Sequence, residues 1–163
     1  MDLWDRQAVD EYNELLIRID PADRTDPGHA FARLRYGDAL EEGDVWVRVH
    51  PEEVDKIVAS ASQVTQPYTR GRASALDPIK DLGKMLFSSL FEGRRDIFFR
   101  RAFRSATSEG KGLRLRFQIE SPVLAKLPWE TLHDGQDFIS LPGRAPVFRM
   151  AGLTQPPRTL PPL

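Results

Sequence analysis

The sequence predicts a mixed fold between the α+β and α/β classes, with antiparallel strands first, an αα-hairpin next and further strands last. Period-two alternation of apolar and polar residues in the first half predicts the antiparallel strands, because one face of each strand then meets water. Apolar residues at helical spacing in the second half predict the paired helices. A chain of 163 residues suits one domain, or one domain with an appended element.

The amino-terminal region, residues 1–62, is expected to contain three strands and a short helix. The alternating segments are residues 15–19, 32–36 and 45–49. The helix starts at Pro51, because proline suits the first turn and the two glutamates that follow suit the positive helix end. Residues 63–76 are polar, contain proline and glycine and show no period, so we expect a linker or mobile loop there.

Residues 77–154 are expected to begin with the two helices and to continue as strands. Asp77 is placed as the cap of the first helix, with Pro78 at its first position. The cleanest strand pattern of the chain covers residues 113–119. Two shorter strands are expected at Phe138–Leu141 and Pro146–Met150. The proline-rich tail, residues 155–163, should be extended.

Composition excludes several functional classes. The net charge is −1, so no overall field recruits nucleic acid or an anionic membrane. No apolar run has the length of a membrane span, and the amino terminus does not resemble a secretory signal. The absence of cysteine removes disulfides, thiolate metal sites and a thiol nucleophile. We therefore expect a cytoplasmic chain without cofactor or metal.

The three histidines, His29, His50 and His133, are not expected to be catalytic. None has a carboxylate at metal-ligand spacing on a helix. His133 and Asp134 are adjacent in sequence, which does not place a base beside the group that orients it. Hydrolysis through His133 or a serine is accordingly not favoured.

A basic stretch with interleaved phenylalanines invites comparison with a nucleic-acid surface. Helical spacing puts Phe98, Phe99 and Phe103 on the buried side of the second helix, and the arginines on the wet side. A solvated helix face is therefore favoured over a nucleic-acid groove, and a surface for an acidic protein or peptide remains an alternative. The basic residues are Arg94, Arg95, Arg100, Arg101, Arg104, Lys111, Arg114 and Arg116.

Trp129 and Glu130 are the candidate framework residues. Trp129 stands among apolar neighbours and is expected to be a core anchor whose indole N–H needs one acceptor. Glu130 should then be partly buried and require a cationic partner. Arg149, in the segment Pro-Val-Phe-Arg-Met, is the candidate. The pair either pins two strands or contributes one charge to a substrate cleft.

The segment Leu-Pro-Trp-Glu-Thr-Leu at 127–132, the alternating strand before it and the Pro-Val-Phe-Arg ending after it resemble the opening half of a CHAT domain. The similarity covers roughly residues 81–163. CHAT domains are caspase-like cysteine peptidases of bacterial signalling or defence systems, with a caspase-like sheet and a Cys–His dyad. The resemblance carries over Trp129, Glu130 and Arg149 as framework. No catalytic residue carries over, because the matching motifs would fall after Leu163.

The sequence thus predicts the non-catalytic amino-terminal portion of a CHAT-type cysteine peptidase, framing a catalytic subdomain that would follow Leu163. Leu163 is then an imposed boundary, a processing site or a natural end. An unfinished sheet edge should associate with the missing catalytic half, with another protein or with a second copy. The alternative is an autonomous protein–protein interaction module derived from this half-domain. Enzyme activity of the chain itself stays open, and neither nucleic acid nor membrane is an expected partner.

Overall fold

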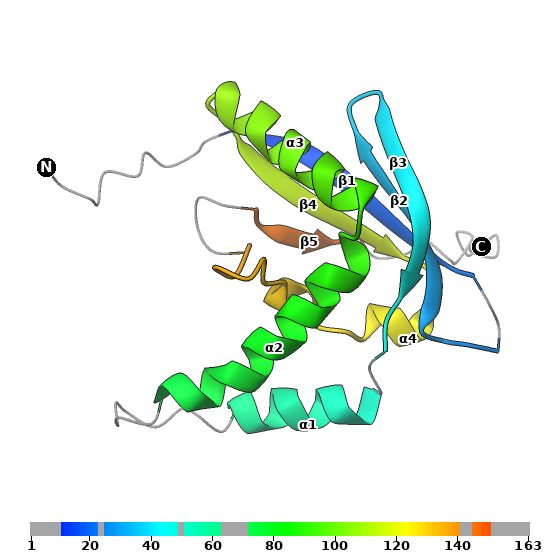
Figure 1. The fold of residues 1–163 in the computed structure, drawn as a ribbon, viewed down its shortest axis with the longest axis vertical. Coiled ribbons are helices and arrows are strands. Elements are labelled where there is room, and N and C mark those ends of the chain that lie inside the picture. The colour runs from blue at the N-terminus through cyan, green and yellow to red at the C-terminus, as the bar shows by residue number, and fades with distance from the viewer. Residues whose placement is uncertain (1–10, 23–24, 49–50, 63–71, 141–144, 151–163) are drawn as a thin grey trace, which may run out of the picture.

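The computed structural model describes residues 11–22, 25–48, 51–62, 72–140 and 145–150. They form a mixed α+β architecture with one five-stranded sheet (Figure 1). The elements are β1 (Tyr12–Pro21), β2 (His29–Tyr36), β3 (Ala39–Trp46), α1 (Pro51–Ser62), α2 (Arg72–Leu90), α3 (Arg94–Ser108), β4 (Gly112–Ile119), α4 (Pro122–Ala125), the 3-10 helix η1 (Trp129–Thr131) and β5 (Val147–Arg149).

The strand order β3-β2-β1-β4-β5 joins both halves of the chain in one sheet. The first three strands form the expected antiparallel meander, but the third covers Ala39–Trp46 rather than residues 45–49, because the turn after Tyr36 starts the pairing at Ala39. β4 then pairs with β1 in parallel, with Leu15 opposite Leu115 and Ile17 opposite Phe117. β5 adds a second parallel pairing at the far side of β4. β1 is therefore the centre of the sheet, where the meander meets the parallel strands.

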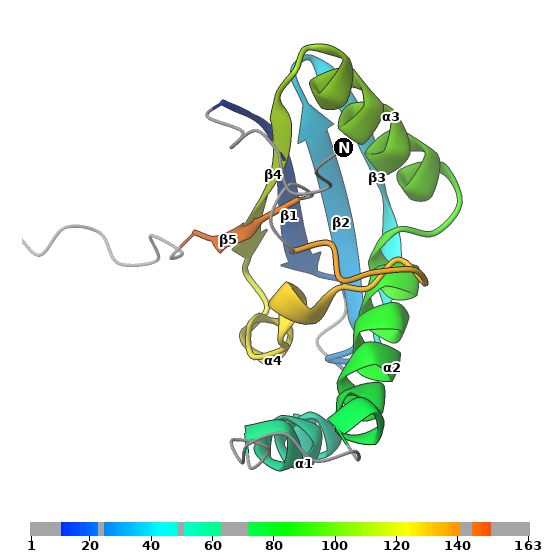
Figure 2. The ribbon, with the colours of Figure 1, turned by 90° about the vertical axis from the view of Figure 1, so that its left-hand side faces the viewer.

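The core lies on one face of this sheet, because alternate residues of β1, β2 and β4 point to the same side. Leu15, Ile17 and Phe117 on that face are fully buried. Figure 2 shows α3 lying along one side of the sheet. The opposite face carries ion pairs between neighbouring strands, including Arg116 with Glu14 at 2.9 Å. This polar pattern is typical of a sheet whose second face meets water.

A glycine break separates α2 from α3. Gly93 has φ +59°, a conformation that residues with a side chain rarely adopt. α3 then lies over the sheet while α2 runs away from it toward α1 (Figure 1). The Asp96 carboxylate in the first turn suits the positive end of α3 and pairs with Arg100.

Arg95 is a correction to the expectation that the arginines of this stretch face water. It is 6% exposed, and its Nε donates a 2.7 Å hydrogen bond to the Leu90 carbonyl at the end of α2. Gly43 of β3 makes room for the guanidinium, since a Cβ there would lie 2.5 Å from Nη1. The free carbonyls at a helix end explain why a cation is buried here.

Three further expectations need revision or fall outside the described residues. α2 begins at Arg72 rather than at Asp77, so Pro78 lies inside the helix. The strand expected at Phe138–Leu141 is reduced to a single bridge between His133 and Phe138, because the Leu132 N–H donates to the Trp129 carbonyl of η1 and does not extend the pairing to Ile139. Residues 63–71 and the tail from 151 lie outside the described residues. Among the described helices, none combines the length and apolar character that a membrane span requires.

Candidate functional site

The segment between β4 and β5 contains the candidate framework residues, and it begins with a short capped helix. The Ser121 hydroxyl accepts a hydrogen bond from the Leu124 backbone N–H at 3.3 Å, and Pro122 occupies the start of α4. Serine at the cap and proline at the first position are a favourable helix start. The Ser-Pro pair that closes β4 therefore also turns the chain into α4.

Trp129, the first residue of η1, is a fully buried anchor between α4 and the sheet. Its indole stacks on Phe117 of β4, with ring centroids 5.4 Å apart and planes inclined by 25°. Its Nε1 donates a 2.8 Å hydrogen bond to the Leu124 carbonyl, which also accepts from the Leu127 backbone N–H at 3.2 Å beyond the end of α4. The predicted core position and the predicted need for one acceptor are both confirmed.

Glu130 and Arg149 form the predicted ion pair. Arg149 Nε lies 2.6 Å from Glu130 Oε1, and Nη2 lies 2.7 Å from Oε2, which is a bidentate contact. The same guanidinium donates to the carbonyls of Ala125 and Leu127, each at 2.6 Å. Arg149 thus ties β5 to the end of α4 and to η1.

Glu130 is more exposed than expected, with 49% of its side chain accessible against 37% for Arg149. Partial burial by itself would raise the pKa of the carboxyl. The hydrogen bonds from Arg149, a backbone hydrogen bond and the attraction of the guanidinium outweigh burial, so the pKa of Glu130 is lowered. The carboxylate therefore stays ionised at neutral pH and holds the arginine rather than acting as a proton donor.

His133 is buried and structural. Its Nδ1 accepts a 3.0 Å hydrogen bond from the Gly135 backbone N–H, and its ring meets Phe138 edge-on at 4.9 Å. Burial, with repulsion from Lys80 and Lys84, lowers the pKa of His133 despite nearby acids. Asp134 does not orient the ring, because its carboxylate accepts from the backbone N–H groups of the next turn. No base–orienter pair results.

Gly83 is a residue of this region that the sequence analysis missed. The Gly83 carbonyl accepts from the His133 backbone N–H at 3.2 Å. A Cβ at position 83 would lie only 1.9 Å from the Thr131 carbonyl oxygen. Only glycine therefore lets α2 approach the η1 segment so closely. A glycine inside a helical pattern, which costs helix propensity, was the available signal.

His29 is the first residue of β2. Its Nε2 is 2.9 Å from Asp44 Oδ1, and its ring stacks on Trp46 at 3.7 Å. Asp44 can thus orient the ring, and Trp46 covers one of its faces. His50 lies outside the described residues.

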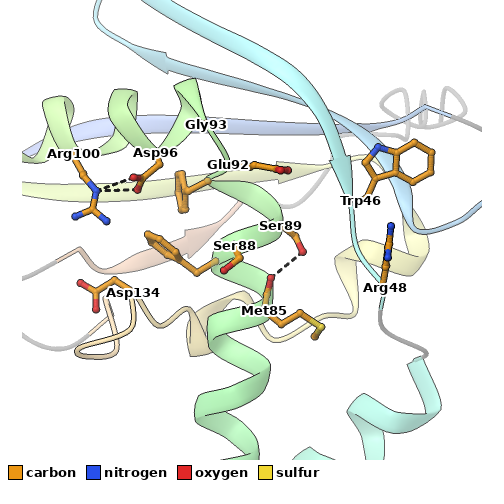
Figure 3. A pocket seen from close by; sticks show the side chains of 12 residues that line it. Trp46, Arg48, Met85, Ser88, Ser89, Glu92, Gly93, Asp96, Arg100 and Asp134 are labelled. Atoms are coloured by element: carbon orange, nitrogen blue, oxygen red, sulfur yellow. Dashed lines mark hydrogen bonds and ion pairs between the residues drawn. The ribbon is translucent and has the colours of Figure 1, made fainter.

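A groove with a volume of about 680 Å³ runs beside the carboxyl-terminal half of α2 (Figure 3). Asp134 and Arg100 stand on one side, and Trp46 and Arg48 on the other (Figure 3). One carboxylate of this groove, that of Asp96, already forms an ion pair with Arg100, with 2.9 Å between Oδ2 and Nε. No histidine stands among the described residues that line the groove.

The described residues hold no group of three or more histidines, aspartates or glutamates that would bind a metal ion, and the chain has no cysteine. The structure brings Trp129, Glu130 and Arg149 together, and their contacts hold β5 against α4 and η1. No family model, curated protein or solved structure matches this chain.

Proposed function

We propose that this chain is the non-catalytic amino-terminal portion of a CHAT-type, caspase-like cysteine peptidase, and that it frames the catalytic subdomain. The Leu-Pro-Trp-Glu-Thr-Leu segment supports this proposal, since its tryptophan and glutamate fix the last described strand. So does the order of the meander, the helix–break–helix and the strand that follows. In this role the chain contributes no nucleophile, which agrees with the absence of cysteine.

The observation that carries the proposal is the outer edge of β5. Leu115 donates to the Pro146 carbonyl and Met150 donates to the Phe117 carbonyl, each at 2.8 Å. In a parallel ladder the residues between, Val147 and Arg149, direct their backbone groups to the other side. No described strand pairs there, because β5 ends the strand order. An edge held rigid by Arg149 can accept the next strand of a peptidase sheet.

The test is the association state of the full chain, measured by size-exclusion chromatography with light scattering. An open, rigid edge predicts concentration-dependent self-association of the isolated chain. Val147→Pro removes an outward N–H without removing a bond to β4, so it should shift the chain toward monomer. Val147→Thr keeps the N–H and serves as the matched control, which should associate as the wild type does.

The alternative, an autonomous interaction module, has its own supporting observation. One cluster of buried apolar residues extends from β1 through the helices to β4 and η1, so the described chain has a continuous core. A chain that is monomeric at all concentrations and melts in one cooperative step would favour this alternative and contradict the half-domain proposal.

A further inference from the structure

The outward face of α3 combines an exposed isoleucine with several exposed arginines. Ile97 stands on it with 59% of its surface exposed, more than any other large hydrophobic residue of the described chain. Residues three, four and seven positions apart lie on one side of an α-helix. Arg94, Arg100, Arg101 and Arg104 have that spacing from Ile97, and all four are exposed. We call these five residues the α3 face.

The sheet explains why this side of α3 points outward. Phe99, Ala102 and Ala106 of the helix are buried against the sheet, and Ile97 lies on the opposite side of the helical wheel. Figures 1 and 2 both show α3 lying over the sheet with its other side uncovered. The α3 face is therefore held rigid by core packing beneath it, and its arginines are presented at fixed helical spacing.

Most of the positive charge on the α3 face is uncompensated. Arg100 pairs with Asp96, with 2.9 Å between Nε and Oδ2. Arg94, Arg101 and Arg104 make no ion pair with any described residue. A hollow of about 280 Å³ beside the face is lined by Glu41, Arg94, Ile97, Phe98 and Arg101. An apolar side chain entering this hollow would contact Ile97 and the half-buried ring of Phe98.

We infer that the α3 face binds an acidic amphipathic helix of a partner protein, with an apolar side chain on Ile97 and carboxylates on the surrounding arginines. The complement of an isoleucine ringed by guanidinium groups is an apolar residue ringed by carboxylates. Arg94 and Arg104 are about 15 Å apart along the axis, so three turns of a partner helix would match them. Helix-on-helix docking of this kind uses anchors at three- and four-residue spacing.

Other anionic partners fit the α3 face less well. Single-stranded nucleic acid needs exposed rings for base stacking, whereas Phe99 is buried and Phe98 and Phe103 are partly buried. A membrane surface needs a broad apolar helix face, whereas this one offers a single exposed apolar residue, Ile97. The inference concerns α3 and holds whether or not β5 accepts a further strand.

The test is a fluorescence anisotropy titration of the full chain with a labelled synthetic helix of about 15 residues, in which a leucine stripe is flanked by glutamates. Arg101→Glu, Arg104→Glu and Ile97→Ser should each weaken binding at least about tenfold at low ionic strength. Arg35→Glu is the matched control: it changes the net charge equally at another exposed arginine, located on β2. Its affinity should stay within about twofold of the wild type.

Circular dichroism would establish that each variant retains the fold, and added salt should weaken the wild-type complex. An equal loss of affinity in Arg35→Glu would overturn the inference, because net charge alone would then drive binding. Tighter binding of an oligouridylate or of phosphatidylserine vesicles than of the helix would overturn it in favour of nucleic acid or membrane. Absence of measurable binding by the acidic helix would also overturn it.

Discussion

The substitution Gly83→Ala has two opposite effects on the stability of the fold. In an exposed helix, alanine in place of glycine stabilises by about 1 kcal/mol. At position 83 the new Cβ would lie 1.9 Å from the Thr131 carbonyl oxygen, against about 3.4 Å for ordinary contact. One of the two backbones must therefore move by about 1.5 Å. Such overpacking costs about 1–3 kcal/mol, and more where rigid backbone must shift.

The contacts around position 83 oppose this movement of the backbone. The η1 segment is held by the Trp129 indole and by the hydrogen bond between His133 and the Gly83 carbonyl. We expect Gly83→Ala to lower the free energy of unfolding by about 2 kcal/mol and the melting temperature by about 4–8 °C in thermal denaturation. Ser88→Ala, at an exposed position of the same helix, is the control and should be neutral or slightly stabilising. A Gly83→Ala protein as stable as the wild type would refute the close approach of α2 to η1.

The remaining predictions concern the charged and titrating groups. Arg149→Met should lower the free energy of unfolding, measured by urea denaturation, by about 2 kcal/mol, because two carbonyls and a carboxylate lose their donor. Arg100→Met, which breaks the exposed ion pair on α3, is the control and should lower it by less than about 0.5 kcal/mol. Equal losses in the two variants would contradict the role of Arg149. Glu130→Gln should cost about 1 kcal/mol at neutral pH. Since the folded pKa of Glu130 lies below its ordinary 4.5, that difference should begin to shrink as the pH falls below 4.5 and should be lost once the pH is below the folded pKa; a pH-independent difference would count against the ion pair. His133 has a folded pKa below 6.5, so the unfolded chain takes up the proton first and the melting temperature should drop as the pH falls below 6.5. His133→Asn should reduce that drop, and an unchanged pH profile would show that His133 does not cause it.

Local patterns in the sequence were sufficient for several elements. The period-two alternation predicted β1, β2 and β4, because one face of each strand is buried and the other is wet. The Trp129 environment and the pairing of Glu130 with Arg149 could also be predicted, since a charge next to a buried anchor needs a partner and few basic residues stand among apolar neighbours. These features depend on neighbouring residues or on charge complementarity.

Features that depend on long-range packing could not be predicted in the same way. Parallel pairing of β1 with β4 brings together residues about a hundred positions apart, and no local pattern encodes it. Arg95 carries a charge and would ordinarily face water, but the free carbonyls at the end of α2 make burial favourable. Phe138–Leu141 has the composition of a strand, yet pairing stops at the His133–Phe138 bridge, because the Leu132 N–H donates to Trp129 and the Ile139 carbonyl accepts from Ala145.

The gene sequence that follows the codon for Leu163 tests the central proposal most directly. We expect an open reading frame that encodes a His-Gly pair and, after a further hydrophobic strand, a cysteine, which together would supply the dyad that this chain lacks. A stop codon directly after Leu163 would contradict the proposal that the chain frames a catalytic subdomain, and would leave the interaction module as the function that remains.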